Sequence, residues 1–244
     1  MRYKMVLQYD GGDFNGFQRQ RSHPSVQQAV EEAISLKLQR PVTIVAAGRT
    51  DAGVHALGQV IHFDSDEPLP ADFHYRINCL LPDSIAALSC ERVPDDFSAR
   101  FSAVRKTYRY DICLSKIHVP LIRRYCHICV YDLDIDAMRK ACAYLIGEHD
   151  FRSFALSDSV KDKNTVRAVY DAHIEERDNN IISFYITGNG FLHNMVRSVV
   201  GTLIDIGRGR FSYLDMPNII AAADSRRAGK TVSGCGLYLV GVEY

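Results

Sequence analysis

A carboxylate in a short polar turn is the strongest candidate for chemistry in this sequence. Asp51 stands near the centre of the nonapeptide Gly48-Arg49-Thr50-Asp51-Ala52-Gly53-Val54-His55-Ala56. Residues 42–46 before it are apolar and mostly β-branched, and residues 58–63 after it alternate like a second strand. Asp51 is therefore predicted to lie in a connection between two strands, where a carboxylate can act as a nucleophile.

The same residues also fit a turn with no catalytic role. Asp commonly accepts backbone hydrogen bonds in turns, and Gly readily adopts a positive φ. Such a turn requires neither Arg49 nor His55, so the complete nonapeptide favours a catalytic loop over a structural one. A single histidine is weak evidence of catalysis, and both His55 and His193 are interpreted as structural hydrogen-bonding residues.

The composition indicates a cytoplasmic globular protein. Its 244 residues, 47% of them hydrophobic, can form one large core or two ordinary ones. The sequence contains no run of eighteen apolar residues and leads directly into a predicted strand, so neither a membrane span nor a signal peptide is expected. Seven cysteines in largely apolar contexts are typical of reduced thiols. The segment Cys126-His127-Ile128-Cys129 has metal-like spacing but no second ligand pair, so no metal is expected.

The distribution of charge points to nucleic acid more than the net charge of zero does. Between Phe97 and Arg124 the chain has seven basic residues and one acid, Asp111, a net charge of +6. Such a segment can line a phosphate-binding surface, and it can equally form a solvated strand face. Interleaved tyrosines, on which bases can stack, favour RNA: they are Tyr108, Tyr110 and Tyr125.

The predicted elements describe two similar halves. The first half has predicted strands at 3–9, 42–47, 58–63 and 85–92, and helices at 25–38, with Ser25 as its N-cap, and 72–80. The second has predicted strands at 107–114, 167–176, 181–187 and 232–242, and helices at 136–147, 191–206 and 213–223. Each half thus follows the βαββαβ order of a ferredoxin-like fold, with long loops at 10–24, 115–133 and 148–165. We expect an α+β protein with domains at 1–104 and 105–244.

Seven motifs, in order along the whole chain, resemble those of the TruA-type tRNA pseudouridine synthases. They are the nonapeptide, Tyr9–Gln20 with Ser25-Val26-Gln27, Phe97–Ala103, Lys106–Tyr110, Asn164–Arg167, Gly188–Leu192 with Met195-Val196-Arg197, and Gly236–Val240. The family usually has Tyr and Trp where Phe14 and Phe17 stand, and Thr where Ser25 stands. These departures affect no proposed catalytic residue.

The resemblance implies a fold and a set of site residues. The fold would be two ferredoxin-like subdomains with a continuous, mostly antiparallel sheet and a cleft between them. Asp51 matches the family's essential aspartate, Arg197 the arginine that pairs with it, and Tyr108 the active-site tyrosine. RNA-binding positions of the family match Arg49, which would accompany the flipped nucleotide, and Arg100 and Arg167.

The implied reaction is the isomerisation of uridine to pseudouridine, which exchanges no electrons and adds no group. It therefore requires no cofactor and no small-molecule cosubstrate. The carboxylate can attack the ribose C1′ or the uracil C6, or it can assist formation of a glycal, and the sequence leaves all three routes open. The resemblance further implies tRNA positions 38 to 40 as targets and a homodimer as the active form.

Two other functions fit parts of the sequence. A non-catalytic RNA-binding protein of the same fold would be expected to lack Asp51, Tyr108 or Arg197, and all three are present. A nucleoside or glycoside hydrolase usually requires a pair of carboxylates around the scissile bond, whereas the motif around Asp51 offers one. The isomerase is the function that the residues favour.

Overall fold

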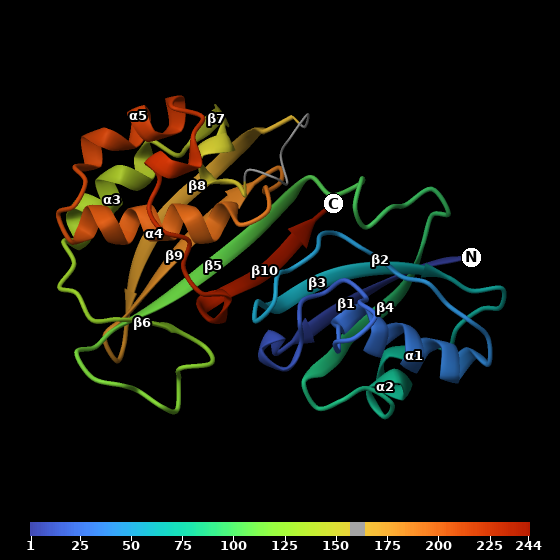
Figure 1. The fold of residues 1–244 in the computed structure, drawn as a ribbon. Coiled ribbons are helices and arrows are strands. Elements are labelled where there is room, and N and C mark those ends of the chain that lie inside the picture. The colour runs from blue at the N-terminus through green and yellow to red at the C-terminus, as the bar shows by residue number, and fades with distance from the viewer. Residues whose placement is uncertain (157–163) are drawn as a thin grey trace. The chain divides into compact units, whose positions relative to one another are not determined.

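A computed structural model describes residues 1–156 and 164–244 of the chain (Figure 1). The chain folds into two compact units, Met1–Val104 with Tyr238–Tyr244, and Arg105–Leu237. Both units combine helices with mostly antiparallel strands, which confirms the predicted α+β class. Residues 238–244 are grouped with the first unit, whereas the sequence analysis placed them in the domain 105–244.

The first unit has the ferredoxin-like topology. Its strands are β1 (Arg2–Tyr9), β2 (Val45–Ala46), β3 (His55–Asp64), β4 (Ile85–Val93) and β10 (Leu237–Glu243), and its helices are α1 (Val26–Leu38) and α2 (Phe73–Asn78). The antiparallel pairs give the order β4-β1-β3-β2, and β10 runs parallel to the start of β3. Figure 1 shows α1 and α2 on the same face of these strands. That face forms the core, with fully buried residues that include Leu7, Ile34, Ile61 and Phe73.

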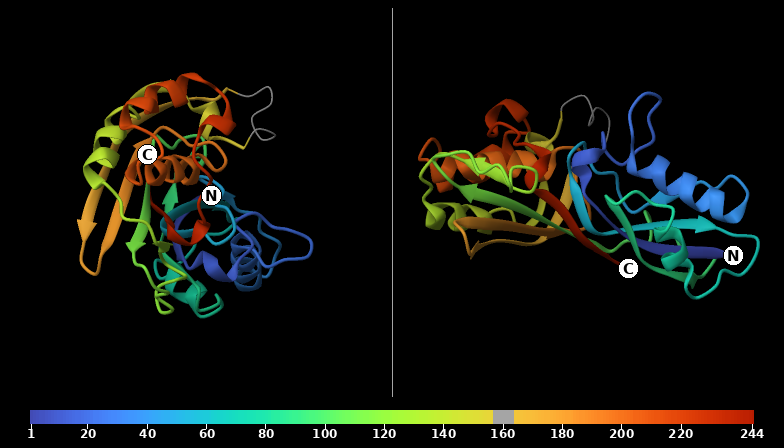
Figure 2. Two further views of the ribbon diagram at one scale, coloured as in Figure 1. Left: turned by 60° about the vertical axis from the view of Figure 1, so that its left-hand side comes forward. Right: turned by 90° about the horizontal axis from the view of Figure 1, so that it is seen from below.

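The second unit departs from that chain order: it has two additional short strands, and no strand follows its last helix among its described residues, because the strand predicted at 232–242 lies mostly in the first unit. Its strands are β5 (Arg105–Leu114), β6 (His127–Cys129), β7 (Gly147–Asp150), β8 (Val166–Arg177) and β9 (Ile181–Gly188), and its helices are α3 (Ile135–Ala143), α4 (Met195–Gly207) and α5 (Met216–Ala221). The antiparallel order is β5-β9-β8-β7, and β6 runs parallel to β5. Figure 2 shows α3 and α4 packed on one face of β5, β9 and β8. Twelve of the thirteen residues of α4 are buried, so this helix forms the centre of the unit.

Single-turn 3-10 helices lie at Gly11–Asp13, Phe151–Phe154, Tyr213–Asp215, Ser225–Arg227 and Gly234–Gly236. Within the described part of the chain, no helix is long and apolar enough to cross a membrane.

Several element limits differ from the predictions for identifiable reasons. The strand predicted at 42–47 pairs only at Val45–Ala46, because side chains of α1 accept the backbone N–H groups of Val42 and Ile44. The helix predicted at 191–206 begins at Met195, because Asn194 adopts a left-handed conformation with φ 66°. The last strand begins at Leu237 rather than residue 232, following a 3-10 turn.

The loop predicted at 148–165 contains two regular elements that the sequence analysis did not identify. Gly147, with φ 117°, follows the end of α3 and begins strand β7, which pairs with β8. The 3-10 helix Phe151–Phe154 then buries both of its phenylalanines. The rest of this predicted loop lies partly outside the described residues, at 157–163.

Candidate active site

Asp51 lies where the sequence predicts it, in the connection between two paired strands. The strands β2 and β3 are antiparallel, and Ala47 extends their ladder by donating its N–H to the carbonyl of Val60 (2.8 Å). The Asp51 carbonyl accepts the N–H of Val54 (3.2 Å) across a turn in which Gly53 has φ 74°. Asp51 itself is half-buried, which leaves part of its surface accessible to a substrate.

The glycine-rich segment after β1 packs directly against this turn. Phe17 donates its N–H to the Thr50 carbonyl (3.0 Å), and Gly16 has φ 95°. A Cβ atom at Gly16 would lie 3.0 Å from that same carbonyl oxygen, and a Cβ at Gly11 would lie 2.0 Å from the carbonyl oxygen of Val54. The absence of side chains at these two positions therefore allows the segment to approach the Asp51 turn.

His55 connects the same segment to the last strand. Its Nδ1 accepts the N–H of Gly11 (3.1 Å) and lies 3.1 Å from a carboxylate oxygen of Asp10. Its ring stacks on Tyr238 with centroids 4.9 Å apart, and only 2% of the residue is exposed. These contacts give His55 the structural hydrogen bond that the sequence analysis expected, whereas His193 is exposed.

A neutral polar cluster lies beneath the Asp51 turn. The hydroxyl of Tyr9 is 2.8 Å from Oγ1 of Thr50, and both residues are buried. The Nε2 of Gln59 donates to the carbonyl of Gly48 (2.9 Å) and lies 3.4 Å from the Tyr9 hydroxyl oxygen. We call Tyr9, Thr50 and Gln59 the loop-anchoring triad. Gln59 binds the backbone of Gly48, and Tyr9 binds the side chain of Thr50, the residue directly before Asp51.

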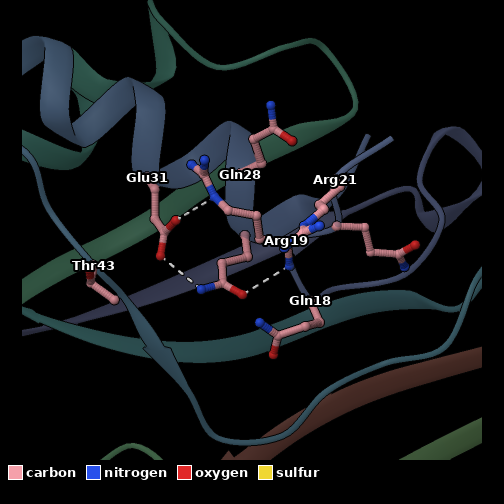
Figure 3. A pocket seen from close by; sticks show the side chains of 8 residues that line it. Gln18, Arg19, Arg21, Gln28, Glu31 and Thr43 are labelled. Atoms are coloured by element: carbon pink, nitrogen blue, oxygen red, sulfur yellow. Dashed lines mark hydrogen bonds and ion pairs between the residues drawn. The ribbon is translucent and has the colours of Figure 1, made fainter. Parts of the chain in front are cut away.

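The buried carboxylate of Glu31 holds the residues that lead into the Asp51 turn. Glu31 on α1, 6% exposed, accepts hydrogen bonds from Arg19 Nε (3.0 Å), Gln27 Nε2 (2.8 Å) and the backbone N–H of Ile44 (3.2 Å). Figure 3 shows the first two of these bonds at the edge of an open polar hollow of about 670 Å³. Glu31 thus joins α1, the segment around Arg19 and Ile44, which directly precedes β2.

In the second unit, Tyr108 lies on β5 opposite Ile186 of β9. It is 9% exposed, and its ring meets that of Phe191 edge to face, with centroids 5.1 Å apart and planes at 81°. The neighbouring Tyr110 is completely buried, and its hydroxyl donates to the carbonyl of Ser233 (2.8 Å). Both tyrosines are therefore buried, Tyr110 completely and Tyr108 with 9% of its surface exposed.

Arg197 occupies the first turn of α4, where its guanidinium is held in one orientation. Its Nε donates to the carbonyl of Val232 (2.8 Å) and its Nη1 to Oδ1 of Asn194 (2.8 Å). The side chain is half-buried. Two directed hydrogen bonds on different nitrogens leave the fork of the guanidinium in a defined plane, which a bidentate carboxylate contact requires.

The three arginines predicted to contact RNA have different surroundings. Arg49 and Arg100 are exposed, and the guanidinium of Arg100 lies over the ring of Phe101 at 5.2 Å. Arg167, on β8, is half-buried, and its Nη1 donates to the carbonyls of Asn164 (3.0 Å) and Val166 (2.6 Å). Burial lowers the pKa of Arg167 from its ordinary value.

The basic segment that the sequence analysis singled out is partly neutralised inside the fold. Arg109 Nε lies 3.0 Å from Oδ1 of Asp111, and both side chains are largely buried. Lys116 pairs with Asp132 (2.7 Å) at the surface, and Arg105 lies over the ring of Tyr170 at 5.1 Å. Two of the seven basic residues, Arg109 and Lys116, thus have an acidic partner.

The thiols of the metal-like segment are buried. Cys126 and Cys129 are 4% and 3% exposed, and His127 belongs to β6. Burial raises the pKa of the Cys126 thiol to about 12 and that of Cys129 above its usual range, and it lowers the pKa of His127. The Cys126 carbonyl accepts a hydrogen bond from the Cys235 thiol (3.4 Å). These residues pack as small apolar groups within the second unit.

Sequence reasoning missed Tyr9, Gln59 and Glu31 as supports of the Asp51 turn. Gln59 is completely buried, although it is a polar residue within the otherwise apolar run 56–61, and that contrast could have marked it. Glu31 lies on the buried side of α1, where an acid without a partner would be costly. Tyr9 carries no signal of its own, because its hydroxyl partner is 41 residues away.

The sequence of this chain matches known proteins along its whole length. Residues 5–102 and 141–244 match the sequence model of a family described as tRNA pseudouridine synthase. A protein named tRNA pseudouridine synthase A from Caldicellulosiruptor bescii is 43% identical over 241 residues, which cover 98% of each chain. Its counterpart from Bacillus subtilis is 44% identical over 248 residues and covers 100% of this chain and 99% of its own.

The matched ranges contain most of the predicted site. Asp51, Arg197 and the three arginines predicted to contact RNA lie within them, whereas Tyr108 lies in the unmatched interval 103–140. That interval is spanned by the relative from Ruminiclostridium cellulolyticum, also named tRNA pseudouridine synthase A, which is 42% identical and covers 100% of this chain and 99% of its own.

Proposed function

The chain belongs to the tRNA pseudouridine synthase family and is an isomerase that converts uridine in tRNA to pseudouridine, and we propose that Asp51 is its catalytic nucleophile. The observation that carries this proposal is the position of Asp51. It is a half-buried carboxylate in a turn whose backbone is held on both sides by neighbouring segments. A nucleophile must be held in one place relative to its target, and such a turn provides this.

The reaction balances without a cosubstrate. The bond between N1 of uracil and C1′ of ribose breaks, the base turns, and a bond forms between C5 and C1′. The hydrogen on C5 leaves as a proton, and N1 gains a proton. Asp51 supplies the electron pair for the attack and recovers it when the enzyme releases the product. The atom attacked, C1′ or C6, and the route through a glycal remain alternatives.

Arg197 is proposed to keep Asp51 ionised and oriented. A carboxylate that is partly removed from water is stabilised by a positive charge beside it, which a guanidinium supplies. The bonds from Arg197 to Val232 and Asn194 use Nε and Nη1, so its plane is set by the protein and not by the substrate. A fixed planar cation favours the ionised carboxylate in one geometry.

Tyr108 is proposed to stack on the uracil of the reacting nucleotide. Its edge-to-face contact with Phe191 holds the ring while leaving part of it exposed. Its hydroxyl could accept the proton from C5, but an ordinary phenol, with a pKa near 10, is a weak base at neutral pH. Stacking is therefore its main proposed role.

A uridine in a stem must leave the helix to reach Asp51, at a cost of a few kcal/mol in lost stacking. Arg49 is exposed two residues before Asp51, which suits a cation that accompanies the flipped nucleotide. Arg100, Arg167 and the basic segment between Arg100 and Arg124 are proposed to contact tRNA phosphates. The proposed targets are positions 38 to 40 of the anticodon stem-loop, in a cytoplasmic homodimer.

The proposed nucleophile is tested with purified protein and unmodified tRNA. The wild type should form pseudouridine at positions 38 to 40, as mapped by chemical labelling and reverse transcription. The variant Asp51→Asn keeps the size of the side chain and removes its charge, so it should bind tRNA normally and form at least about a thousandfold less product. Substantial pseudouridine formation by Asp51→Asn would exclude Asp51 as the nucleophile.

The same experiment separates the other functions. A hydrolase would release free uracil, and a non-catalytic RNA-binding protein would leave uridine unchanged. The location of the product on the tRNA tests the target positions independently of the mechanism. The mass of the protein in solution without RNA tests the homodimer.

A further inference from the structure

The loop-anchoring triad has no role in the chemistry described so far, yet it holds the two residues that flank Arg49. Gln59 binds the carbonyl of Gly48, and Tyr9 binds the side chain of Thr50. Tyr9, Thr50 and Gln59 are 3%, 7% and 0% exposed, so water competes little for these bonds. Thr50 directly precedes Asp51, and its carbonyl is held by Phe17 as well.

The direction of each hydrogen bond in the triad follows from the groups involved. The Gly48 carbonyl can only accept, so the amide of Gln59 must present Nε2 to it, and the second hydrogen of Nε2 is directed to the Tyr9 oxygen. Tyr9 is then left with its own proton, whose available acceptor is Oγ1 of Thr50 at 2.8 Å. Gln59 thus donates to Tyr9, and Tyr9 donates to Thr50.

We propose that Tyr9 is a positioning residue for the isomerase, which acts through Thr50 to hold the Asp51 turn in its reactive geometry. This inference rests on the proposed role of Asp51. Without the Tyr9 hydroxyl, Oγ1 of Thr50 loses its donor in a buried place, and the turn gains freedom beside the nucleophile. A displacement of about 1 Å at a reacting group can cost a hundredfold in rate.

Tyr9 acts through its hydrogen bond and not as an acid or base. Burial raises its pKa to about 12, so the phenol stays protonated throughout the range in which tRNA is handled. Loss of its hydroxyl should lower the rate by the same factor at every pH, so the apparent pKa values of the pH–rate profile should not change. A phenol that exchanged protons with the substrate would change these values.

The chain offers a matched control on the same strand. Tyr3 lies at the other end of β1, is 5% exposed, and its hydroxyl accepts the N–H of Leu69 (2.9 Å). Tyr3→Phe also removes the hydroxyl of a buried tyrosine, but far along the strand from the turn, and it loses one hydrogen bond where Tyr9→Phe loses two. Thermal unfolding of both variants measures what each costs in stability, so a loss of rate confined to Tyr9→Phe in a fully folded protein reports positioning.

The experiment measures the single-turnover rate of pseudouridine formation and the Kd for tRNA. Tyr9→Phe and Thr50→Val should each lower the rate about ten- to a hundredfold, with Kd changed less than twofold. Thr50→Ser, which keeps the hydroxyl, should stay within about threefold of wild type, as should Tyr3→Phe. The double variant Tyr9→Phe/Thr50→Val should be no slower than the slower single variant, because both remove the same bond.

Three outcomes would overturn the proposal: a Tyr9→Phe rate equal to that of Tyr3→Phe, rate losses that multiply in the double variant, or a Kd that rises in proportion to the loss of rate. Asp51→Asn, measured alongside, separates the two proposals. An inactive Asp51→Asn with a fully active Tyr9→Phe refutes only the positioning role, whereas an active Asp51→Asn refutes the nucleophile itself.

Discussion

The first unit presents the proposed nucleophile on a turn, and the second presents the tyrosine and arginine proposed to act with it on regular elements. Asp51 has no strand or helix of its own, and its backbone position depends on Phe17, Gly11 and the loop-anchoring triad. Tyr108 stands within the ten-residue strand β5, and Arg197 stands in the first turn of a buried helix. The two halves therefore reach a defined geometry by different physical means.

This difference predicts where each unit is sensitive to substitution. A turn is held by contacts with residues distant in sequence. In the first unit, substitutions at positions that never contact the substrate should therefore affect catalysis. A strand or helix positions its side chains through its own backbone bonds. In the second unit, the sensitivity should be concentrated in Tyr108 and Arg197 and the groups that they touch.

The largest expected effect is that of Gly11→Ala in the first unit. The new Cβ would lie 2.0 Å from the carbonyl oxygen of Val54, so the backbone must move, at a cost of about 3 kcal/mol or more in the free energy of unfolding. Thermal unfolding and pseudouridine formation measure both consequences. Gly241→Ala is the control, because a Cβ there has no atom within 4 Å. Equal behaviour of the two variants would mean that the turn does not depend on the segment after β1.

A smaller but still large effect is expected for Arg197→Lys in the second unit. Lysine keeps the charge but cannot donate to Val232 and Asn194 while presenting a planar fork. The single-turnover rate should fall roughly a hundred- to a thousandfold, with little change in tRNA affinity. Arg208→Lys, just after the same helix, is the control. If rate and affinity fall equally, Arg197 is a phosphate contact instead of a partner for Asp51.

Weaker effects on RNA binding would show whether both units share the tRNA surface. Arg100→Ala, in the first unit, and Arg167→Ala, in the second, should each flatten the slope of log affinity against log salt by about one. Arg76→Ala is the control, because Arg76 is already paired with Asp72 (2.9 Å). Unchanged slopes for both test variants would remove these arginines from the surface, and a change in one alone would confine phosphate binding to that unit.

The smallest expected effect is a dependence of stability on pH that originates partly in the first unit. Burial lowers the pKa of His62, whose Nδ1 accepts the N–H of Ala99 (3.0 Å) beside Arg100. The unfolded chain takes up this proton near pH 6.5 and the folded chain only at lower pH, so stability falls as pH drops below about 6.5.

The variant His62→Asn keeps an acceptor for Ala99 and removes the titration. Urea unfolding at pH 7.5 and pH 5.5 should therefore show a smaller loss of stability for His62→Asn than for wild type. Identical losses would assign the dependence to other groups, among them His127 in the second unit, whose pKa burial also lowers.

Much of the fold was predictable because local signals agreed with the tertiary structure. Ser25 was predicted as the N-cap of the first helix, and its hydroxyl accepts the N–H of Gln28 (3.3 Å) before α1 begins at Val26. The predicted strands at 58–63 and 181–187 correspond to β3 and β9, although burial in β3 does not alternate: its five consecutive residues Gln59–Phe63 are all buried. The start of α4 was predicted four residues early, because the left-handed conformation of Asn194 has no distinct local signal.

By itself, the sequence determined the family, the α+β class, the βαββαβ order of the first unit and the location of Asp51 in a turn between strands, because motifs and periodicity are local properties of the chain. The tertiary structure alone decided how that turn is held. Tyr9 meets Thr50 across 41 residues, and Gln59 meets Gly48 across a hairpin. Partners of this kind depend on strand register and on the close approach that Gly11 and Gly16 permit. Strand register and the close approach of these segments are set only when the whole unit packs, so no local sequence pattern predicts them.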